Sequence, residues 1–326
     1  MASVKEISTR IRSIQDTKKI TKAMYMISSI KLRKAKKKLE ETEPFFYGLQ
    51  SEIASILYHF PEVTSRYFTN TEEDKGDSVK NSAYLVITGD KGMCGAYNHN
   101  VIKETDAMIK SEIDYNIFVV GAVGRQYYIS RGYNVDEGFA YTATDPTMHR
   151  ARNIAMYLLD LFEKRKIDNI KIVYTRMVNS MVSEVETEEL LPLKGREFIS
   201  REMQKKKEKA ESEGAHMKKF VSEDDEDYSD PDKAGEFAIY PSPEKVLDRL
   251  VENYVIGYIY SALVESSSSE ENARMMAMDA ATDNAEDILK TLSIQYNKVR
   301  QASITQEITE VIGGAKALKK KKLDLT

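Results

Sequence analysis

The chain has 326 residues, of which 41% are hydrophobic and 31% are charged, and its net charge at pH 7 is −4. This composition is typical of a globular protein with at least one buried core, and the length favours two structural units. No window approaches the ~18 uninterrupted apolar residues of a membrane span, and the N-terminus lacks the zones of a secretory signal.

We therefore expect a cytosolic protein in the compartment that makes it. A single cysteine, Cys94, excludes an internal disulfide, and the four histidines lack the spacing of metal ligands. The sequence supports neither a redox switch nor a metal centre.

The first element is a long helix, predicted over residues 3 to about 58. Good helix formers dominate it, and Ile7, Ile11 and Ile14 begin an apolar stripe in steps of four and three. The stripe is narrow, which suits a coiled-coil seam better than a globular core. Pro44 is expected to kink or interrupt this helix.

This helix is strongly basic. Residues 1–40 contain twelve Lys or Arg and three acidic residues, which gives the segment a net charge of +9. Such an asymmetry indicates an acidic counterpart, either nucleic acid, anionic lipid or an acidic protein. A simpler interpretation is a solvated helix face.

An alternation of strands and helices follows. Strands bounded by turn residues alternate with helices, which favours βαβ units and a parallel or mixed sheet covered by helices. A weakly alternating run at 181–193 is a candidate edge strand. The strands are expected at 83–88, 115–121 and 169–178, and the helices at 98–111 and 146–166.

Residues 194–235 interrupt this pattern with a charged segment. Ten of its residues, 223–232, include seven acids. A segment with so few apolar residues cannot bury enough surface to offset its ordering entropy. We interpret it as a mobile insertion.

The last element is a helix predicted from 243 to about 312. Ser242 is its expected N-cap, and Pro243 fills the first helical position. The run SSSSEE at 266–271 either restarts the helix by capping or forms a small-residue patch that allows close approach.

The apolar stripe of this helix changes face. Up to Ala302 it is expected to run through the positions of one seam, and the apolar residues then move two positions, to a stripe that begins at Ile304. The first set is Ala281, Ala285, Ile288, Leu292, Gln295, Val299 and Ala302, and the second is Ile304, Ile308, Val311, Ala315 and Leu318. Two residues at ~100° each turn the face by about 200°.

The order of these elements predicts the architecture. Both long helices leave one central domain, and neither buries its stripe alone, so they are expected to pair antiparallel. The fold class is α/β plus a long antiparallel coiled coil, with the N- and C-terminal helices paired around a central Rossmann-like domain. The predicted domains are 1–58, 59–240 with the insertion at about 194–235, and 241–326 with a basic tail.

Sites for chemistry are weakly indicated. VITGDKGMCGAYN at 86–98 is a strand followed by a glycine-rich turn, which can cradle a phosphate, but its glycines are spaced GxxGxxG and no GxxxxGK[ST] occurs. A tight strand-to-helix connection with a buried Cys94 is the simpler interpretation. No GxSxG or HExxH motif occurs, and we predict no catalytic residue, no cofactor and no metal site.

Two further hypotheses compete at this level. The basic run KLRKAKKKL at 31–39 would neutralise nucleic-acid phosphates, but Tyr25 is the only aromatic residue before Phe45. A basic coiled-coil adaptor that binds nucleic acid is therefore the alternative function. A nucleotide-binding α/β enzyme is a third and weaker hypothesis.

Three long stretches resemble a known family. KEISTRIRSIQDTKKITKAMYMISSIKLRKA, GDKGMCGAYN and SSSEENARMMAMDAATDNAEDILKTLSIQYNKVRQASITQEITEVIGGAKAL are similar to the gamma subunit of the F-type ATP synthase. The resemblance implies a central rotating stalk, not an enzyme on its own, that couples proton or sodium flow to ATP synthesis. Its implied partners are the alpha and beta subunits of the catalytic ring, the epsilon subunit and the membrane c-ring, without nucleic acid. The implied location is peripheral, on the cytoplasmic face of a bacterial plasma membrane.

The resemblance also implies contact residues. The family's contacts with the catalytic-subunit loop fall on Arg300, Gln301, Thr305 and Glu307 of RQASITQE. Arg300 suits bidentate pairing with a carboxylate, and Gln301 suits a directional hydrogen bond. Met24 matches a position that faces the acidic loop of the catalytic subunit. Its expected electrostatic neighbours there are Lys22, Lys31, Arg33 and Lys34.

Overall fold

The computed structural model describes residues 3–68, 81–110, 112–179, 182–195, 198 and 239–323, with side chains described as far as Lys316. The chain divides into two compact units. One comprises Met1–Ile30 with Arg274–Thr326, and the other comprises Lys31–Ala273. The predicted insertion at 194–235 lies almost entirely outside the described residues.

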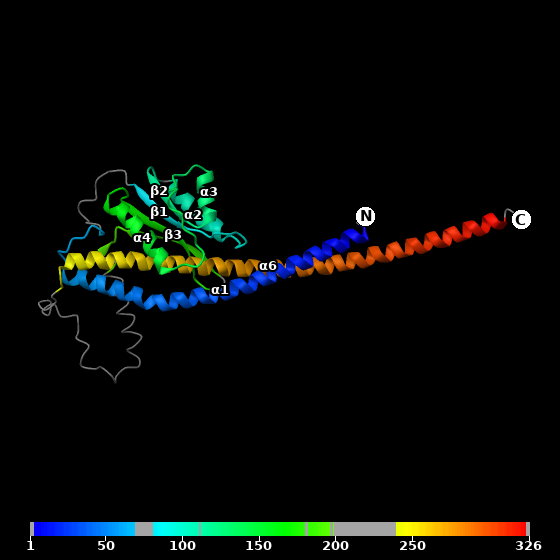
Figure 1. Ribbon diagram of the computed structural model, residues 1–326, viewed down its shortest axis with the longest axis horizontal. Helices are drawn as coiled ribbons and strands as arrows, with labels where there is room; N and C mark the ends of the chain where they lie inside the picture. Colours follow the sequence, from blue (N-terminus) through cyan, green and yellow to red (C-terminus); the bar gives the residue numbers. More distant parts are fainter. Residues whose placement is uncertain are drawn as a thin grey trace, which may run out of the picture. The chain divides into compact units, whose positions relative to one another are not determined.

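The two predicted long helices are confirmed. Helix α1 spans Val4–His59 and helix α6 spans Pro243–Leu323, and both are drawn side by side in Figure 1. The backbone N–H of Lys245 donates to Ser242 Oγ (3.4 Å), so the predicted N-cap is present.

The expected interruption at Pro44 is wrong. Proline removes one backbone hydrogen bond, yet α1 continues through Pro44. Packing beyond the proline offers the physical reason: Phe46 stacks on Tyr254, with ring centroids 5.1 Å apart, and meets Tyr258 edge-on at 5.8 Å. Tertiary contacts of this kind commonly outweigh a local propensity.

In the unit formed by Met1–Ile30 and Arg274–Thr326, the helices pair antiparallel. Lys18 forms an ion pair with Glu286, and the hydroxyl groups of Thr21 and Thr282 lie 2.8 Å apart. As one helix advances, its partner residue number falls. The predicted antiparallel pairing is therefore confirmed.

The seam of this pair differs in part from the predicted one. Ala285 and Leu292 are buried as expected, but Ile288 is 42% exposed and Gln295 is exposed. The alternate seam positions are instead occupied by the half-buried residues Leu289, Tyr296 and Ser303. The steps of four and three are correct, but the other half of the seam lies one residue later.

The other unit contains a four-stranded sheet with the order β2-β1-β3-β4. The first three strands are parallel and β4 is antiparallel at the edge, as predicted. The strands are β1 (Ser82–Ile87), β2 (Tyr115–Val120), β3 (Asn169–Met177) and β4 (Ser183–Leu191).

Three shorter helices accompany the sheet. The two predicted ones are α2 (Tyr97–Ile109) and α4 (Met148–Glu163). The sequence analysis missed α3 (Ala122–Ser130), because GAVGRQ was weighed only as a glycine-rich turn. Thr147 caps α4 by accepting from the backbone N–H of Arg150 at 3.3 Å.

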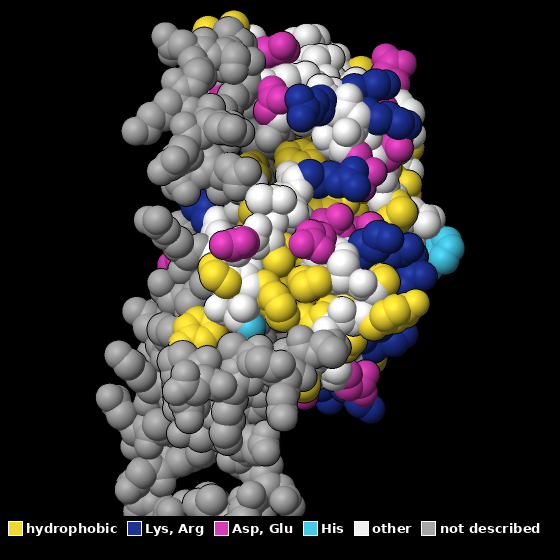
Figure 2. All heavy atoms as spheres, turned by 90° about the vertical axis from the view of Figure 1, so that its left-hand side faces the viewer, with side chains coloured by type: hydrophobic (Ala, Val, Ile, Leu, Met, Phe, Trp, Pro, Cys, Tyr) yellow, Lys and Arg dark blue, Asp and Glu magenta, His cyan; other side chains and the backbone are white. Residues whose placement is uncertain are grey.

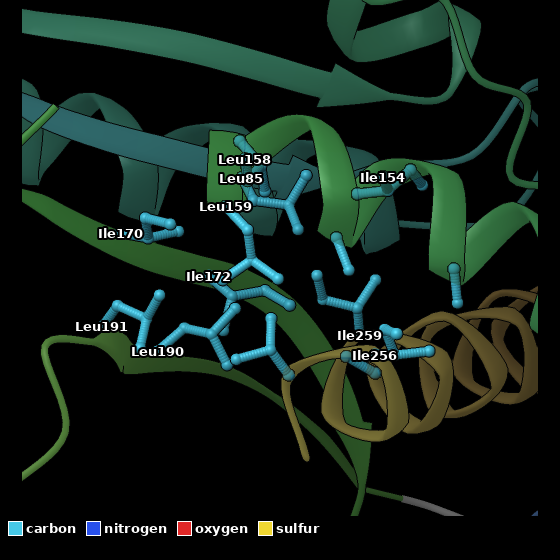
Figure 3. Close-up of a cluster of buried hydrophobic side chains, with 14 of the residues drawn as sticks. Leu85, Ile154, Leu158, Leu159, Ile170, Ile172, Leu190, Leu191, Ile256 and Ile259 are labelled. Carbon is cyan, nitrogen blue, oxygen red and sulfur yellow. The ribbon is translucent and has the colours of Figure 1, made fainter. Parts of the chain in front are cut away.

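The core lies on both faces of this sheet. On one face Leu85 and Ile172 pack with Leu158 and Leu159 of α4, and α6 adds Ile256 and Ile259 (Figure 3). On the other face a smaller cluster holds side chains of β1, β2 and α2: Tyr84, Val86, Ile117, Val119, Val101 and Ile102. Burial on both faces explains the continuous apolar runs of the parallel strands.

Of the helices described, none combines the length and the apolar character that crossing a membrane requires.

Candidate functional site

The C-terminal end of α6 has no partner helix in its own unit. Helix α1 begins at Val4, and the ion pair between Lys18 and Glu286 places Val4 level with about residue 300 of α6. From Ile304 to Lys316 every residue of α6 is exposed. Figure 1 shows α6 continuing past the first residues of α1.

An apolar stripe covers one side of this free segment. Ile304 is 45% exposed, Ile308 is 53% exposed and Val311 is 71% exposed. With ~100° per residue, these three positions fall within about 60° of one another around the helix. The stripe therefore faces solvent rather than the α1 seam, as the pattern in the sequence indicates.

Four of the implied contact residues border this stripe. Arg300 and Glu307 are seven residues apart and lie on one side of it, while Gln301 and Thr305 are four residues apart and lie on the other. All four are exposed, and the Thr305 hydroxyl donates to the Gln301 carbonyl oxygen at 2.9 Å. The segment thus presents an apolar strip with polar groups along both margins.

The implied contact residues of α1 are divided between the two units. Lys22 and Met24 lie in the first unit, where Lys22 is exposed and Met24 is half-buried. In the second unit Arg33 and Lys34 are exposed, and Lys31 donates to Glu271 Oε1 at 3.1 Å. Lys31 therefore has a partner within the chain, which the sequence analysis did not anticipate.

Other lysines of α1 are also paired within the chain. Lys38 donates to Asp145 Oδ1 at 3.0 Å, and the hydrogen bond and charge of Lys38 hold the pKa of Asp145 below its usual range. Figure 2 shows one face of the molecule, on which Lys and Arg side chains are interspersed with Asp and Glu. Part of the +9 charge is thus offset by acidic groups of α6 and the sheet-bearing unit.

The glycine-rich turn is a packed connection between β1 and α2. Gly89 donates its backbone N–H to Asn98 Oδ1 at 2.8 Å, and a Cβ on Gly89 would lie 2.9 Å from the side chain of Glu270. Cys94 is buried, and Asn98 Nδ2 approaches its sulfur at 3.2 Å. These contacts agree with the tight strand-to-helix connection.

Buried serines of α6 allow this close packing. Ser266, Ser268 and Ser269 are almost fully buried, and α6 passes through SSSSEE without a break. The Ser266 hydroxyl lies 2.7 Å from that of Tyr97, and Ser269 Oγ donates to the Thr175 carbonyl oxygen at 3.1 Å. Of the two hypotheses for this run, the small-residue patch is the correct one. The described residues contain no group of three or more His, Cys, Asp or Glu side chains that could hold a metal ion.

Asp90 joins this turn to two other segments. Its carboxylate accepts from the backbone N–H of Ala122 (3.2 Å) and from both the backbone N–H and the hydroxyl of Thr144 (2.8 and 2.7 Å). Burial alone would raise the pKa of Asp90, but these hydrogen bonds outweigh it and the pKa is lowered.

We expect Asp90→Asn to flatten the acid limb of the stability profile. Because the folded pKa lies below the unfolded value of about 3.9, the carboxylate stabilises the fold fully above pH ~5 and loses this effect as the pH falls through the folded pKa. Urea midpoints between pH 3 and pH 6 test this, with Asp114→Asn at an exposed position as the control. A midpoint that falls as steeply in Asp90→Asn as in the unchanged chain would contradict the assignment.

Comparison with known proteins identifies the family. The family model described as "ATP synthase" matches residues 3–318. The ATP synthase gamma chain of Acetivibrio thermocellus is 42% identical over 98% of this chain and 100% of its own length. That of Caldanaerobacter subterraneus subsp. tengcongensis is 44% identical over 95% and 98%. A gamma chain described as sodium ion specific, from Acetobacterium woodii, is 33% identical over 97% and 99%.

Solved structures show the same fold at lower identity. A chain from the central stalk and c-ring of Tetrahymena thermophila mitochondrial ATP synthase superposes with a TM-score of 0.54 at 22% identity, and it covers 80% of this chain and 99% of its own length. A chain of the Euglena gracilis mitochondrial enzyme gives 0.52 at 20% identity, over 92% and 96%. With near full-length relatives above 40% identity, the chain belongs to the ATP synthase gamma chains, the central stalk subunits of F-type ATP synthase.

Proposed function

We propose that this gamma chain is the rotating shaft that couples ion flow through the membrane sector to ATP synthesis and hydrolysis in a ring of alpha and beta subunits. One observation carries the proposal most directly. Beyond Val4 of α1, the segment 304–316 of α6 is exposed and carries an apolar strip bordered by Arg300, Gln301, Thr305 and Glu307. An apolar surface of this kind favours a partner of its own.

The coupling follows from the asymmetry of this surface. Arg300 and Gln301 lie on opposite margins of the strip, so the charged margin and the amide margin meet different subunits of a ring at any one time. A contact that is stronger with one conformation of a subunit shifts the population toward that conformation. Turning the shaft would move this preference from one catalytic site to the next.

The basic face of α1 supplies the second contact in this proposal. Lys22, Arg33 and Lys34 are exposed, and Met24 is half-buried among them. Exposed cations act mainly by steering and by salt-dependent attraction to acidic loops. Lys31 would serve both its internal partner Glu271 and an acidic loop, because its side chain is 52% exposed.

The remaining partners and the location follow from the family. We propose the epsilon subunit and the c-ring as partners of the sheet-bearing unit, with the complex peripheral on the cytoplasmic face of a bacterial plasma membrane. The solved complexes of the two mitochondrial enzymes contain a c-ring. In this role the chain makes and breaks no covalent bond and needs no cofactor of its own.

Co-purification tests the proposal against the nucleic-acid alternative. The tagged full-length chain should recover alpha and beta subunits at native salt, and an oligonucleotide should not compete for them. Failure to recover the ring from cells that express all subunits would overturn the shaft proposal. Saturable oligonucleotide binding that weakens steeply with salt and survives removal of residues 296–318 would favour the adaptor instead.

A further inference from the structure

A cavity of about 350 Å³ opens in the sheet-bearing unit, between α1, α6 and the β3–β4 edge of the sheet. Its volume falls within the range of small-molecule sites. Three elements contribute to the wall, so the cavity is a property of the packed unit rather than of one loop. The side chains that form it include Phe46, Tyr47, Tyr174, Tyr258, Glu186, Glu188, Glu265 and Arg176.

Aromatic rings form much of this wall. Phe46 lies 6.3 Å from Tyr47 and 5.8 Å from Tyr258, and Tyr174 meets Tyr258 edge-on at 6.5 Å, all between ring centroids. Several ring faces around one space attract an organic cation through their quadrupoles. The wall therefore suits a group that is both partly apolar and positively charged.

The charges of the wall point to the same class of ligand. Arg176 Nε pairs with Glu186 Oε2 at 3.2 Å, and the Tyr174 hydroxyl donates to the same oxygen at 2.9 Å. That pair offsets itself, which leaves the cavity with the negative charges of Glu188 and Glu265. Burial, the neighbouring Tyr258 and the charge of Glu265 raise the pKa of Tyr174, consistent with a negative potential.

A second cavity of about 150 Å³ adjoins the first. Both are lined by Glu188 and Tyr258, and the second also contains Glu189, whose carboxylate lies 3.6 Å from Lys194 Nζ. Glu188 thus stands where the two spaces meet. Their sequence along β4 fits an extended ligand better than a compact one.

We propose that these two cavities form a binding site for a linear aliphatic polyamine, with one ammonium group near Glu265 and another near Glu188, and with the methylene chain against Phe46 and Tyr258. This site is independent of the contacts proposed for α6 and the ring. The same ammonium chemistry exists in a lysine side chain, but the joined cavities fit a free chain with charges at both ends.

Titration calorimetry of the full-length chain with spermidine tests the site. We expect saturable binding of one molecule per chain, and at least tenfold weaker binding of butylamine, which carries one charge. Glu188→Gln should weaken spermidine binding about tenfold, because a buried carboxylate contact is lost. Tyr47→Leu should weaken it two- to fivefold through the lost ring.

Glu184→Gln is the matched control, since Glu184 is an exposed acid on the same strand that lines neither cavity. It should leave the affinity unchanged, and thermal melts should show that all variants are folded. Equal weakening by Glu184→Gln and Glu188→Gln, or full competition by Mg²⁺ at matched ionic strength, would overturn the site. So would tighter binding of a lysine peptide than of spermidine.

Discussion

Replacing Gly121 by alanine should unfold the sheet-bearing unit under conditions in which the unchanged chain is folded. Gly121 follows β2 with a φ of 99°, a conformation that L-residues rarely adopt. A Cβ there would lie 2.1 Å from the carbonyl oxygen of Thr88. That oxygen belongs to the backbone just after β1, so it cannot swing aside as a side chain would.

The surrounding hydrogen bonds make the clash more costly. The Thr88 backbone N–H donates to the Val120 carbonyl oxygen at 2.9 Å, and the Gly121 N–H donates to that of Tyr141 at 2.9 Å. Moving either strand end far enough to admit a methyl group breaks these bonds. We expect a loss of about 4 kcal/mol or more, which is a large part of a typical domain's stability.

Gly132→Ala separates the two contributions. Gly132 also has a positive φ, 75°, but nothing lies within 4 Å of its would-be Cβ. Its cost should be only the backbone strain of about 1–2 kcal/mol. Denaturant midpoints followed by near-ultraviolet circular dichroism measure both variants, and equal losses would show that contact with Thr88 is not what requires glycine.

These glycines also show where sequence reasoning stopped. GAVGRQ was weighed as a phosphate-binding turn, and its helix α3 was missed. In the structure Gly121 and Gly124 both lie against Thr88, 34 residues or so earlier in the chain, so the requirement for glycine is a close approach between distant segments. A local pattern contains no information about such a neighbour.

The long helices were predictable because their signal is repeated many times. Apolar steps of four and three, few helix breakers and the antiparallel exit from one domain indicate α1, α6 and their pairing. Which residue of an adjacent pair faces the seam was less certain. Ile288 and Leu289 are both apolar, and only the position of the partner helix decides that Leu289 is the more buried.

The basic segment illustrates the opposite limit. Its charge was evident from composition, but its partners Glu271 and Asp145 lie more than 100 residues away in sequence. Pairing within the chain explains part of the positive charge, and Lys22, Arg33 and Lys34 retain exposed positions for an external partner. A count of charges alone could not divide the lysines between these two roles.

Gln301→Leu should lower the ATP turnover of the assembled complex about tenfold while the chain folds and assembles normally. Gln301 is exposed on one margin of the apolar strip, and its side chain contributes to no buried seam. Leucine is a good helix former, so the helix should persist. The variant loses the amide's hydrogen bonds to the catalytic subunit, and a difference of 1.4 kcal/mol in the rate-limiting contact corresponds to a tenfold change.

Asn297→Leu is the matched control for this variant. Asn297 is exposed one turn earlier on the same helix and is outside the implied contact set, so it adds the same apolar surface without removing a proposed contact. ATP hydrolysis of purified complexes with equal subunit ratios measures both. If Asn297→Leu lowered turnover as much as Gln301→Leu, added hydrophobicity would explain the loss. If neither changed turnover, Gln301 would not be a contact, and the polar margins of the strip would serve only to keep the free end of α6 soluble.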